Sequence, residues 1–200
     1  MFLHVRARQL LLLLPLLLGF TSVACNTVTE VAPKVEEVPA TVYTIKKGSH
    51  YSDRNNVRKL TSNRISFEVS FDSTAIYTSA KSNNQADINK LYGLSDCNTS
   101  HHTNSARFGW RWYNNRLEVL AYTYRNKKWD YKLLGPVPLG QIIALELRME
   151  DGSYVFEMLG KEVSMPRACN GAAEGYQLYP YFGGDETAPH DITIRIKDLK

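Results

Sequence analysis

The side chains best suited to bind a ligand surround a polar run at residues 95–105 and the aromatic segment that follows it. A run so rich in Ser, Asn, Thr and His is typical of a loop, and loops on a rigid scaffold commonly carry binding groups. Sugar recognition combines aromatic rings, which pack against the C–H faces of a pyranose, with planar amide or guanidinium groups that bind its hydroxyls. The residues that we predict to bind a ligand supply this mixture: His101, Asn104, Arg107, Arg111, Tyr122 and Tyr124.

Alternation along the chain separates these arginines from the neighbouring tryptophans. In residues 106–112, Trp110 and Trp112 share one face with Phe108, and we expect that face to lie in the core. Arg107 and Arg111 then lie on the opposite face. Residues 113–116 have the composition of a turn, and residues 117–124 continue as a second strand. The resulting hairpin places Tyr122 and Tyr124 beside the arginines.

A second polar segment, residues 179–191, offers different chemistry. Its acids and His190, together with a histidine of the first run, provide the oxygen and imidazole ligands that divalent metals use. The alternative is that Asp185 or Asp191 braces the loop by accepting hydrogen bonds from backbone amides. Both interpretations stay open, so we assign no metal, and we predict no cofactor.

The elements that position these residues are predicted to be strands, because the dominant period from residue 41 onward is two. Asp151-Gly152 is a strong hairpin signal between two of them. One helix is expected at residues 84–92, with Asn84 as its cap and Gly93 at its end. The predicted strands are residues 64–71, 106–112, 117–124, 142–148, 153–159, 176–182 and 192–197. This pattern predicts an all-β protein, an antiparallel β-sandwich of the jelly-roll type with one short helix.

Three segments resemble the concanavalin-type lectin and glucanase sandwiches: residues 67–72, the aromatic hairpin at 108–124 and the terminal strand at 191–198. The resemblance covers residues 41–200 and implies a jelly-roll domain that binds or cleaves carbohydrate. Jelly-roll alginate lyases are also similar at residues 141–143 and 181–183. Their catalytic histidine would fall at Ile143, and their Arg-x-Glu-x-Arg strand would fall at residues 107–111, which lack the acid. Both differences argue against catalysis.

Catalysis by hydrolysis needs two carboxyl groups about 5 Å apart in a retaining enzyme. No predicted strand carries such a pair, and no Gly-x-Ser-x-Gly motif occurs. Glu118, Glu146 and Glu157 each stand alone on their predicted strands. The enzyme that remains as an alternative would use His101 or His190 with Asp185 or Glu186.

The N-terminal segment has the order of an export signal, with Arg6 and Arg8 before a leucine-rich run of about eleven residues, too short to span a membrane. The small residues before Cys25 resemble the lipobox of bacterial lipoproteins, in which this cysteine carries the lipid. The resemblance implies a signal peptide at residues 1–24, a lipidated Cys25 with a flexible tether at residues 25–40, and a sandwich at residues 41–200. It also implies a bacterial cell-envelope protein, and the Asn26 that follows the cysteine favours the outer membrane. Ordinary cleavage after Ala24 is the alternative.

With Cys25 assigned to the lipid, Cys97 and Cys169 remain as an even pair in an exported protein, which favours a disulfide. Two separate buried thiols are the alternative. The formal net charge of +4 is modest for 200 residues and does not indicate nucleic-acid binding.

The sequence therefore favours a lipid-anchored sandwich that binds a glycan or another surface ligand without turning it over. The first alternative is a jelly-roll polysaccharide hydrolase or lyase. The second is a structural envelope lipoprotein that docks on a protein partner through the same face.

Overall fold

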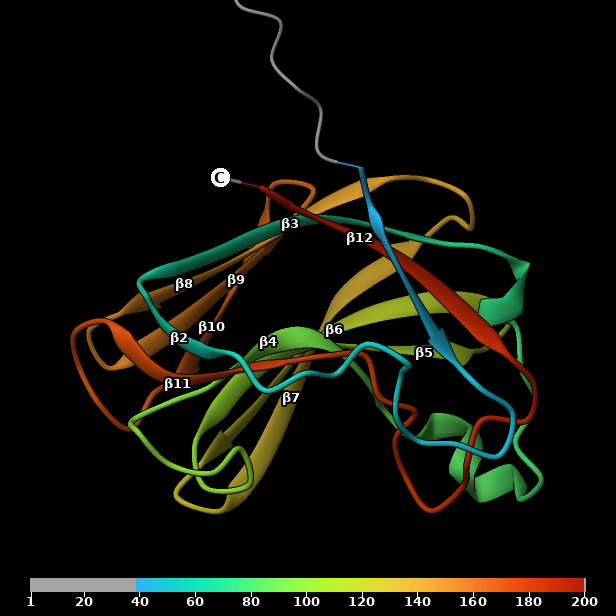
Figure 1. The fold of residues 1–200 in the computed structure, drawn as a ribbon, viewed down its shortest axis with the longest axis horizontal. Coiled ribbons are helices and arrows are strands. Elements are labelled where there is room, and N and C mark those ends of the chain that lie inside the picture. Colours follow the sequence, from blue (N-terminus) through green and yellow to red (C-terminus); the bar gives the residue numbers. More distant parts are fainter. Residues whose placement is uncertain (1–38, 200) are drawn as a thin grey trace, which may run out of the picture. The chain divides into compact units, whose positions relative to one another are not determined.

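In the computed structural model, which describes residues 39–199, the chain forms two six-stranded antiparallel sheets packed face to face (Figure 1). Sheet A contains, in spatial order, β1 (Thr41–Ile45), β12 (Ile192–Leu199), β3 (Arg64–Phe71), β8 (Ile143–Glu150), β9 (Ser153–Met158) and β10 (Lys161–Pro166). Sheet B contains β2 (Lys59–Ser62), β11 (Ala173–Leu178), β4 (Asn89–Ser95), β5 (Ser105–Tyr113), β6 (Arg116–Arg125) and β7 (Lys128–Val137). The predicted antiparallel β-sandwich is confirmed.

Tight turns fix the register of the hairpins. Asn114 and Asn115, at φ 51° and 57°, join β5 to β6, and Asn126 and Lys127, at φ 51° and 67°, join β6 to β7. Two successive residues with positive φ are typical of the type I′ turn, whose twist matches that of paired strands. The resulting register sets Arg107 opposite Tyr122, as the alternation predicted.

The core lies between the sheets and is dominated by aromatic rings. Phe108 of β5 contacts Phe67 of β3 at a ring-centroid distance of 5.6 Å and Phe156 of β9 at 5.1 Å. Trp110 is fully buried and Trp112 packs at the edge of the same core, so the tryptophans occupy the predicted face. Burying a side chain of this size contributes about 2–3 kcal/mol relative to its exposed state.

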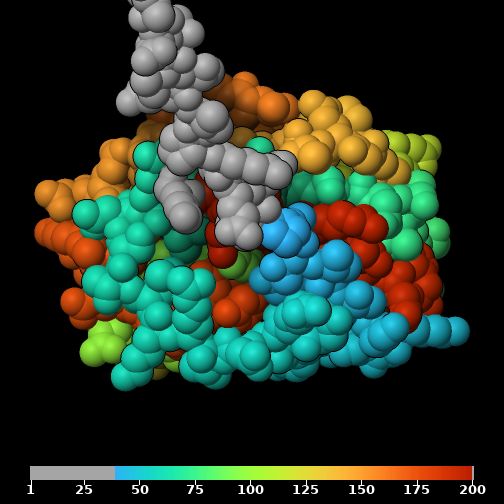
Figure 2. Space-filling view, turned by 45° about the horizontal axis from the view of Figure 1, so that its top comes forward, coloured from blue at the N-terminus to red at the C-terminus, as the bar shows by residue number. Residues whose placement is uncertain are grey.

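The two ends of the described chain meet in sheet A. β1 pairs with β12 from Thr41 opposite Ile196 to Ile45 opposite Ile192. In the space-filling view of Figure 2, the blue atoms of β1 lie beside the red atoms of the C-terminal segment. This pairing makes the C-terminal strand an inner strand of sheet A, with β1 at the edge.

The predicted helix at residues 84–92 is wrong. Two short 3₁₀ segments, η1 (Ser73–Ala75) and η2 (Ser82–Ala86), precede β4, and residues 39–199 contain no α-helix. β4 is buried along most of its length, so its apolar side chains do not alternate. Ile88, Leu91 and Tyr92 have the spacing of a helical face, and pairing with β5 and β11 overrides it.

A disulfide joins Cys97 to Cys169, as predicted, with a Cα–Cα distance of 5.8 Å. Beside it, Asp96 accepts hydrogen bonds from Arg167 Nε and Tyr154 Oη, both at 2.7 Å. The loop between β4 and β5 is thereby fixed to β9 and to the segment that precedes β11.

The predicted signal peptide, the lipidated Cys25 and the tether up to residue 38 lie outside the described residues and stay predictions. No helix within residues 39–199 is long and apolar enough to cross a membrane.

Candidate functional site

A groove of about 460 Å³ lies on the outer face of sheet B, the face turned away from the core. It is bounded by β4, β5, β6 and β11, by the loop between β4 and β5, and by the segments around residues 51–57 and 179–184. We define the groove by its charged and aromatic side chains: Lys90, His101, His102, Arg107, Tyr122, Tyr124, Tyr176 and Tyr181. No aspartate or glutamate is among its lining residues.

Close packing of two strands places Arg107. Gly93 of β4 lies opposite Arg107 of β5, and a Cβ atom at Gly93 would come within 2.2 Å of the Ala106 carbonyl oxygen. Any side chain at this position would push the two strands apart. On the other side, Arg107 pairs with Tyr122 of β6, and its guanidinium carbon lies 5.8 Å from the centre of the Tyr122 ring.

Arg107 is a buried cation without an acidic partner among the described residues. Its residue exposure is 7%, its Nε has no hydrogen-bond acceptor, and no carboxylate lines the groove around it. Burial lowers the pKa of Arg107, although the group stays charged at neutral pH. A buried charge that lacks a counter-charge costs folding free energy. The arrangement is therefore complementary to an anion supplied from outside.

Lys90 is the second cation of the groove. Its Nζ donates to the Ile88 carbonyl oxygen and lies 4.2 Å from the centre of the Tyr122 ring. Burial, and then the positive charge of Arg107, lower the pKa of Lys90 to about 7. The backbone of Lys90 exchanges two hydrogen bonds with Tyr181, which holds the 179–184 segment over the end of β4.

The histidines of the polar run form one rim of the groove. His101 Nδ1 lies 2.7 Å from Tyr176 Oη, and the two histidine rings are 4.1 Å apart. Burial, followed by the charge of Arg107 and the neighbouring His102, lowers the pKa of His101 to about 4. His101 is therefore neutral at physiological pH and exchanges a hydrogen bond with the tyrosine.

The structure brings four of the six predicted ligand-binding residues together: His101, Arg107, Tyr122 and Tyr124. Arg111 lies elsewhere, where its Nε donates to Glu118 at 2.9 Å and its Nη1 donates to the Ala86 carbonyl. Asn104 is buried in the loop, and its Oδ1 accepts a hydrogen bond from the Asn126 amide at 2.9 Å. These two side chains position the strands and the loop and do not line the groove.

The second polar segment acts as a brace in the described structure. Glu186 accepts hydrogen bonds from the Ala80 and Lys81 amides, and Asp191 accepts one from the Lys47 amide. His190 Nε2 lies 2.8 Å from the Thr74 carbonyl oxygen. Because these side chains lie away from the groove, they do not join His101 in a catalytic or metal-binding cluster.

Residues 39–199 contain no cluster of side chains suited to bind a metal ion. Asp96, Cys97 and Cys169 are the one group whose ligand atoms lie close enough together. Both cysteine sulfurs are used by the disulfide, and Asp96 is bound to Arg167 and Tyr154.

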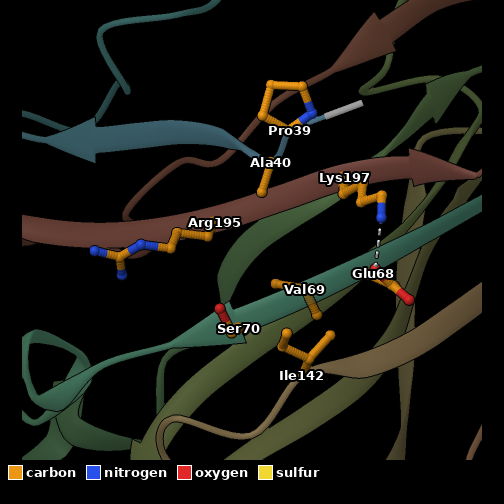
Figure 3. Close-up of a pocket in the computed structure, with 8 residues that line it drawn as sticks. All are labelled: Pro39, Ala40, Glu68, Val69, Ser70, Ile142, Arg195 and Lys197. Carbon is orange, nitrogen blue, oxygen red and sulfur yellow. Dashed lines mark ion pairs between the residues drawn. The ribbon is translucent and has the colours of Figure 1, made fainter. Parts of the chain in front are cut away.

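A second hollow, of about 350 Å³, lies on the outer face of sheet A and is shown in Figure 3. Its cations have acidic partners: Lys197 Nζ lies 3.8 Å from Glu68, and Arg195 Nη1 lies 3.0 Å from Asp72. This hollow offers no unsatisfied charge, so the groove on sheet B is the stronger candidate.

Sequence reasoning missed Lys90, Tyr176 and Tyr181 as groove residues. Lys90 fell in the segment predicted as a helix. Tyr181 meets Lys90 through an isolated bridge between residues 91 positions apart, which no local pattern reveals. The alternation of Trp129, Tyr131 and Leu133 with charged residues is a local signal for β7.

Comparison with protein-family models and with curated sequences finds no match. Among solved structures, the chain is similar to the alginate lyase AlyC3, with a TM-score of 0.54 and 13% identity over 80% of this chain and 74% of that chain. The chain is a jelly-roll β-sandwich. AlyC3 in complex with dimannuronate gives a TM-score of 0.53 and 12% identity over 80% of this chain and 75% of that chain. The carbohydrate-binding module CBM66 from Bacillus subtilis gives a TM-score of 0.39 and 7% identity over 73% of this chain and 75% of that chain. At these identities the likeness shows the fold alone.

Proposed function

We propose that the groove on sheet B binds a glycan chain that carries carboxylate groups. The observation that carries this proposal is Arg107, a cation that is buried, faces the groove and has no acidic partner among residues 39–199. A sugar carboxylate would supply the missing anion and would form charge-assisted hydrogen bonds with the guanidinium group.

The rest of the lining supports a sugar in preference to a small inorganic anion. Tyr122, Tyr124, Tyr176 and Tyr181 present rings that can pack against the C–H faces of a pyranose and hydroxyls that can bind its oxygens. A similar fold has been solved with dimannuronate, an acidic disaccharide. No lining carboxylate would repel such a ligand.

Calorimetric titration of the purified protein with dimannuronate and with the neutral disaccharide mannobiose tests the proposal. We expect dimannuronate to bind and mannobiose to bind at least about tenfold more weakly, because a buried charge pair contributes more than 1.4 kcal/mol. Arg107→Met should abolish binding and leave the melting temperature unchanged or higher, since methionine removes a charge that has no partner. Arg195→Gln, which changes the hollow on sheet A, is the control and should bind normally. Equal affinity for both disaccharides would overturn the proposal.

A second candidate function is cleavage of the same chain by β-elimination, and Lys90 is the observation that favours it. An amine with a pKa of about 7 is half unprotonated at neutral pH and can accept a proton. In this reaction the base takes the proton from the sugar carbon next to the carboxylate, and a carbon–carbon double bond forms as the bond to the glycosidic oxygen breaks. The departing oxygen takes a proton from a tyrosine hydroxyl of the groove. Arg107 would stabilise the negative charge that develops on the carboxylate. Hydrolysis by a pair of carboxyl groups is not supported, because the groove has none.

Ultraviolet absorbance of unsaturated uronate products separates the two functions. Product formation by the wild type and its loss in Lys90→Gln at a saturating oligosaccharide concentration would establish elimination. Stable binding with no product would leave the groove as a binding site.

We also propose that the chain is anchored in a bacterial envelope through a lipid on Cys25, as the lipobox-like segment implies. Labelled palmitate should attach to the wild type and not to Cys25→Ser. Failure of the wild type to incorporate label would overturn the anchor and leave the glycan proposal untouched.

A further inference from the structure

Beside the groove, a row of aromatic side chains crosses from the buried Tyr122 on β6 to two exposed rings on the edge strand β7. We define the aromatic row as Tyr122, Trp129 and Tyr131. The Tyr122 and Trp129 ring centroids are 6.3 Å apart with planes 7° from parallel, and those of Trp129 and Tyr131 are 6.0 Å apart with planes at 12°. Trp129 is 58% exposed and Tyr131 is 40% exposed. Exposed aromatic surface of this kind usually marks a binding site.

The aromatic row lines a hollow of its own, of about 360 Å³, which shares Lys90, Tyr122 and Gly184 with the groove. The two hollows are therefore neighbours on one face of sheet B. Across the strand order β11, β4, β5, β6, β7, they span four strand spacings, roughly 19 Å at about 4.8 Å each. This length exceeds one sugar ring and suits a chain of several linked rings.

The chemistry of the second hollow differs from that of the groove. Its acidic residue is Asp87, and its one cation, Lys90, lies at the shared boundary. A sugar over the aromatic row would be held by contact between its C–H groups and the rings and not by charge. Lys128, Asp130 and Lys132 alternate with the aromatic residues along β7, and charges on an edge strand discourage pairing with a second copy.

We propose that the aromatic row is an additional subsite that binds further units of the same glycan chain whose carboxylate occupies the groove. This inference rests on the proposed function and adds to it that the preferred ligand is an oligosaccharide or polysaccharide, because a disaccharide over Arg107 does not need to contact Trp129.

Titration of the purified full chain with uronate oligosaccharides of two and six units tests the subsite. The wild type should bind the hexamer more tightly than the dimer. Trp129→Ala should weaken hexamer binding by about tenfold, the effect of losing an aromatic contact, and leave dimer binding unchanged. The matched control is Leu133→Ala, because Leu133 is also 40% exposed on β7 but does not line the hollow. It should bind both ligands normally.

Salt and fluorescence give independent measurements. Because the aromatic row has no charge role, the loss in Trp129→Ala should be the same at low and high salt, whereas binding at Arg107 should weaken with salt. The hexamer, and not the dimer, should protect Trp129 from a soluble quencher. Trp110 is fully buried and the half-buried Trp112 lines neither hollow, so the protection should disappear in Trp129→Ala, which keeps both.

The possible outcomes separate the two proposals. If the wild type binds neither uronate, the proposed function fails and the subsite fails with it. If the wild type binds both lengths equally and Trp129→Ala matches it, the subsite is overturned while the proposed function stands. If Trp129→Ala instead converts a dimer of the protein to a monomer in light scattering, the aromatic row is a self-association surface and the subsite is overturned.

Discussion

The outer face of sheet A pairs its cations with acids, whereas the groove on sheet B does not. On sheet A, Arg148 alone contacts four glutamates: Glu146 at 3.2 Å, Glu150 at 3.4 Å, Glu157 at 3.1 Å and Glu162 at 2.6 Å. On sheet B, Arg107 and Lys90 face the groove with no carboxylate among its lining residues. The face of sheet A satisfies its charges within the chain, and the groove leaves its two cations without a lining acid.

Burial explains why this difference matters energetically. The ion pairs of sheet A are partly solvated, and pairs of that kind contribute between about 0 and 1 kcal/mol each. The cations of sheet B are removed from water, which raises the cost of leaving them unpaired. A buried, unpaired arginine lowers the stability of the fold, a cost that the proposed ligand would offset.

The interior contains a buried arginine that does have an acidic partner. Asp96 and Arg167 have fully buried side chains, and Arg167 Nε donates to Asp96 at 2.7 Å. Tyr154 and the Cys97 and Glu174 amides complete the hydrogen bonding of the carboxylate. Here a buried arginine has the partner that Arg107 lacks.

The largest expected effect follows from breaking this interior pair. Asp96→Asn should lower the free energy of unfolding by about 3–5 kcal/mol, because it leaves Arg167 as an uncompensated buried charge. Urea unfolding at pH 7 measures the loss. A change below about 1 kcal/mol would show that Asp96 and Arg167 behave like a surface pair.

The same pair gives a pH signature with a defined sign. Burial acts to raise the pKa of Asp96, but hydrogen bonds from Arg167, Tyr154 and the Cys97 amide outweigh it and hold this pKa below its ordinary value. The carboxylate therefore stabilises the fold above about pH 4 and loses that contribution as pH falls through the lower folded pKa. Asp96→Asn should remove this part of the acid sensitivity.

An effect of intermediate size is expected on the affinity for dimannuronate when Lys90 loses its charge with rising pH. Its pKa of about 7 means that the free protein loses this cation between pH 6 and pH 8. Affinity for dimannuronate should then fall by about tenfold over that range, because the protonated form binds the carboxylate. Arg107 and Tyr122 beside it stay protonated there, and the pKa of His101 is already about 4.

Lys90→Gln should flatten the pH profile, and Lys132→Gln, which removes a lysine outside the groove, should leave it unchanged. A profile that is flat in the wild type would mean that Lys90 is not part of the binding site.

The smallest change in the free energy of unfolding is expected from a substitution on sheet A. Arg148→Gln removes a cation with four acidic neighbours, yet it should lower the free energy of unfolding by only about 1 kcal/mol and leave dimannuronate affinity unchanged. Thermal unfolding and the same titration provide the measurements. A loss of binding in this variant would contradict the assignment of the ligand to sheet B.

Much of the fold was predictable because apolar and polar side chains alternate along individual strands. β3, β8 and β12 alternate buried with more exposed side chains, and β5 and β6, although buried on both faces, alternate by residue type. Several of the turns carry Asn or Gly where positive φ is needed. β4 was not predictable in this way because it is covered on both faces.

The site was predictable to the extent that it lies on one hairpin. Arg107, Tyr122 and Tyr124 follow from the pairing of β5 with β6. The same logic placed Arg111 in the site, but Glu118 lies directly opposite it and neutralises it. Lys90 and Tyr181 come from distant parts of the chain, and their meeting depends on long-range pairing that composition and periodicity do not encode.

The position of Pro39 and Ala40 has a practical consequence. Both residues border the hollow on sheet A, on the opposite side of the sandwich from the groove. A sensor chip or bead coupled at Pro39 or Ala40 would thus leave the groove accessible, so surface-immobilised protein should bind the proposed polysaccharide ligand as readily as free protein does in solution.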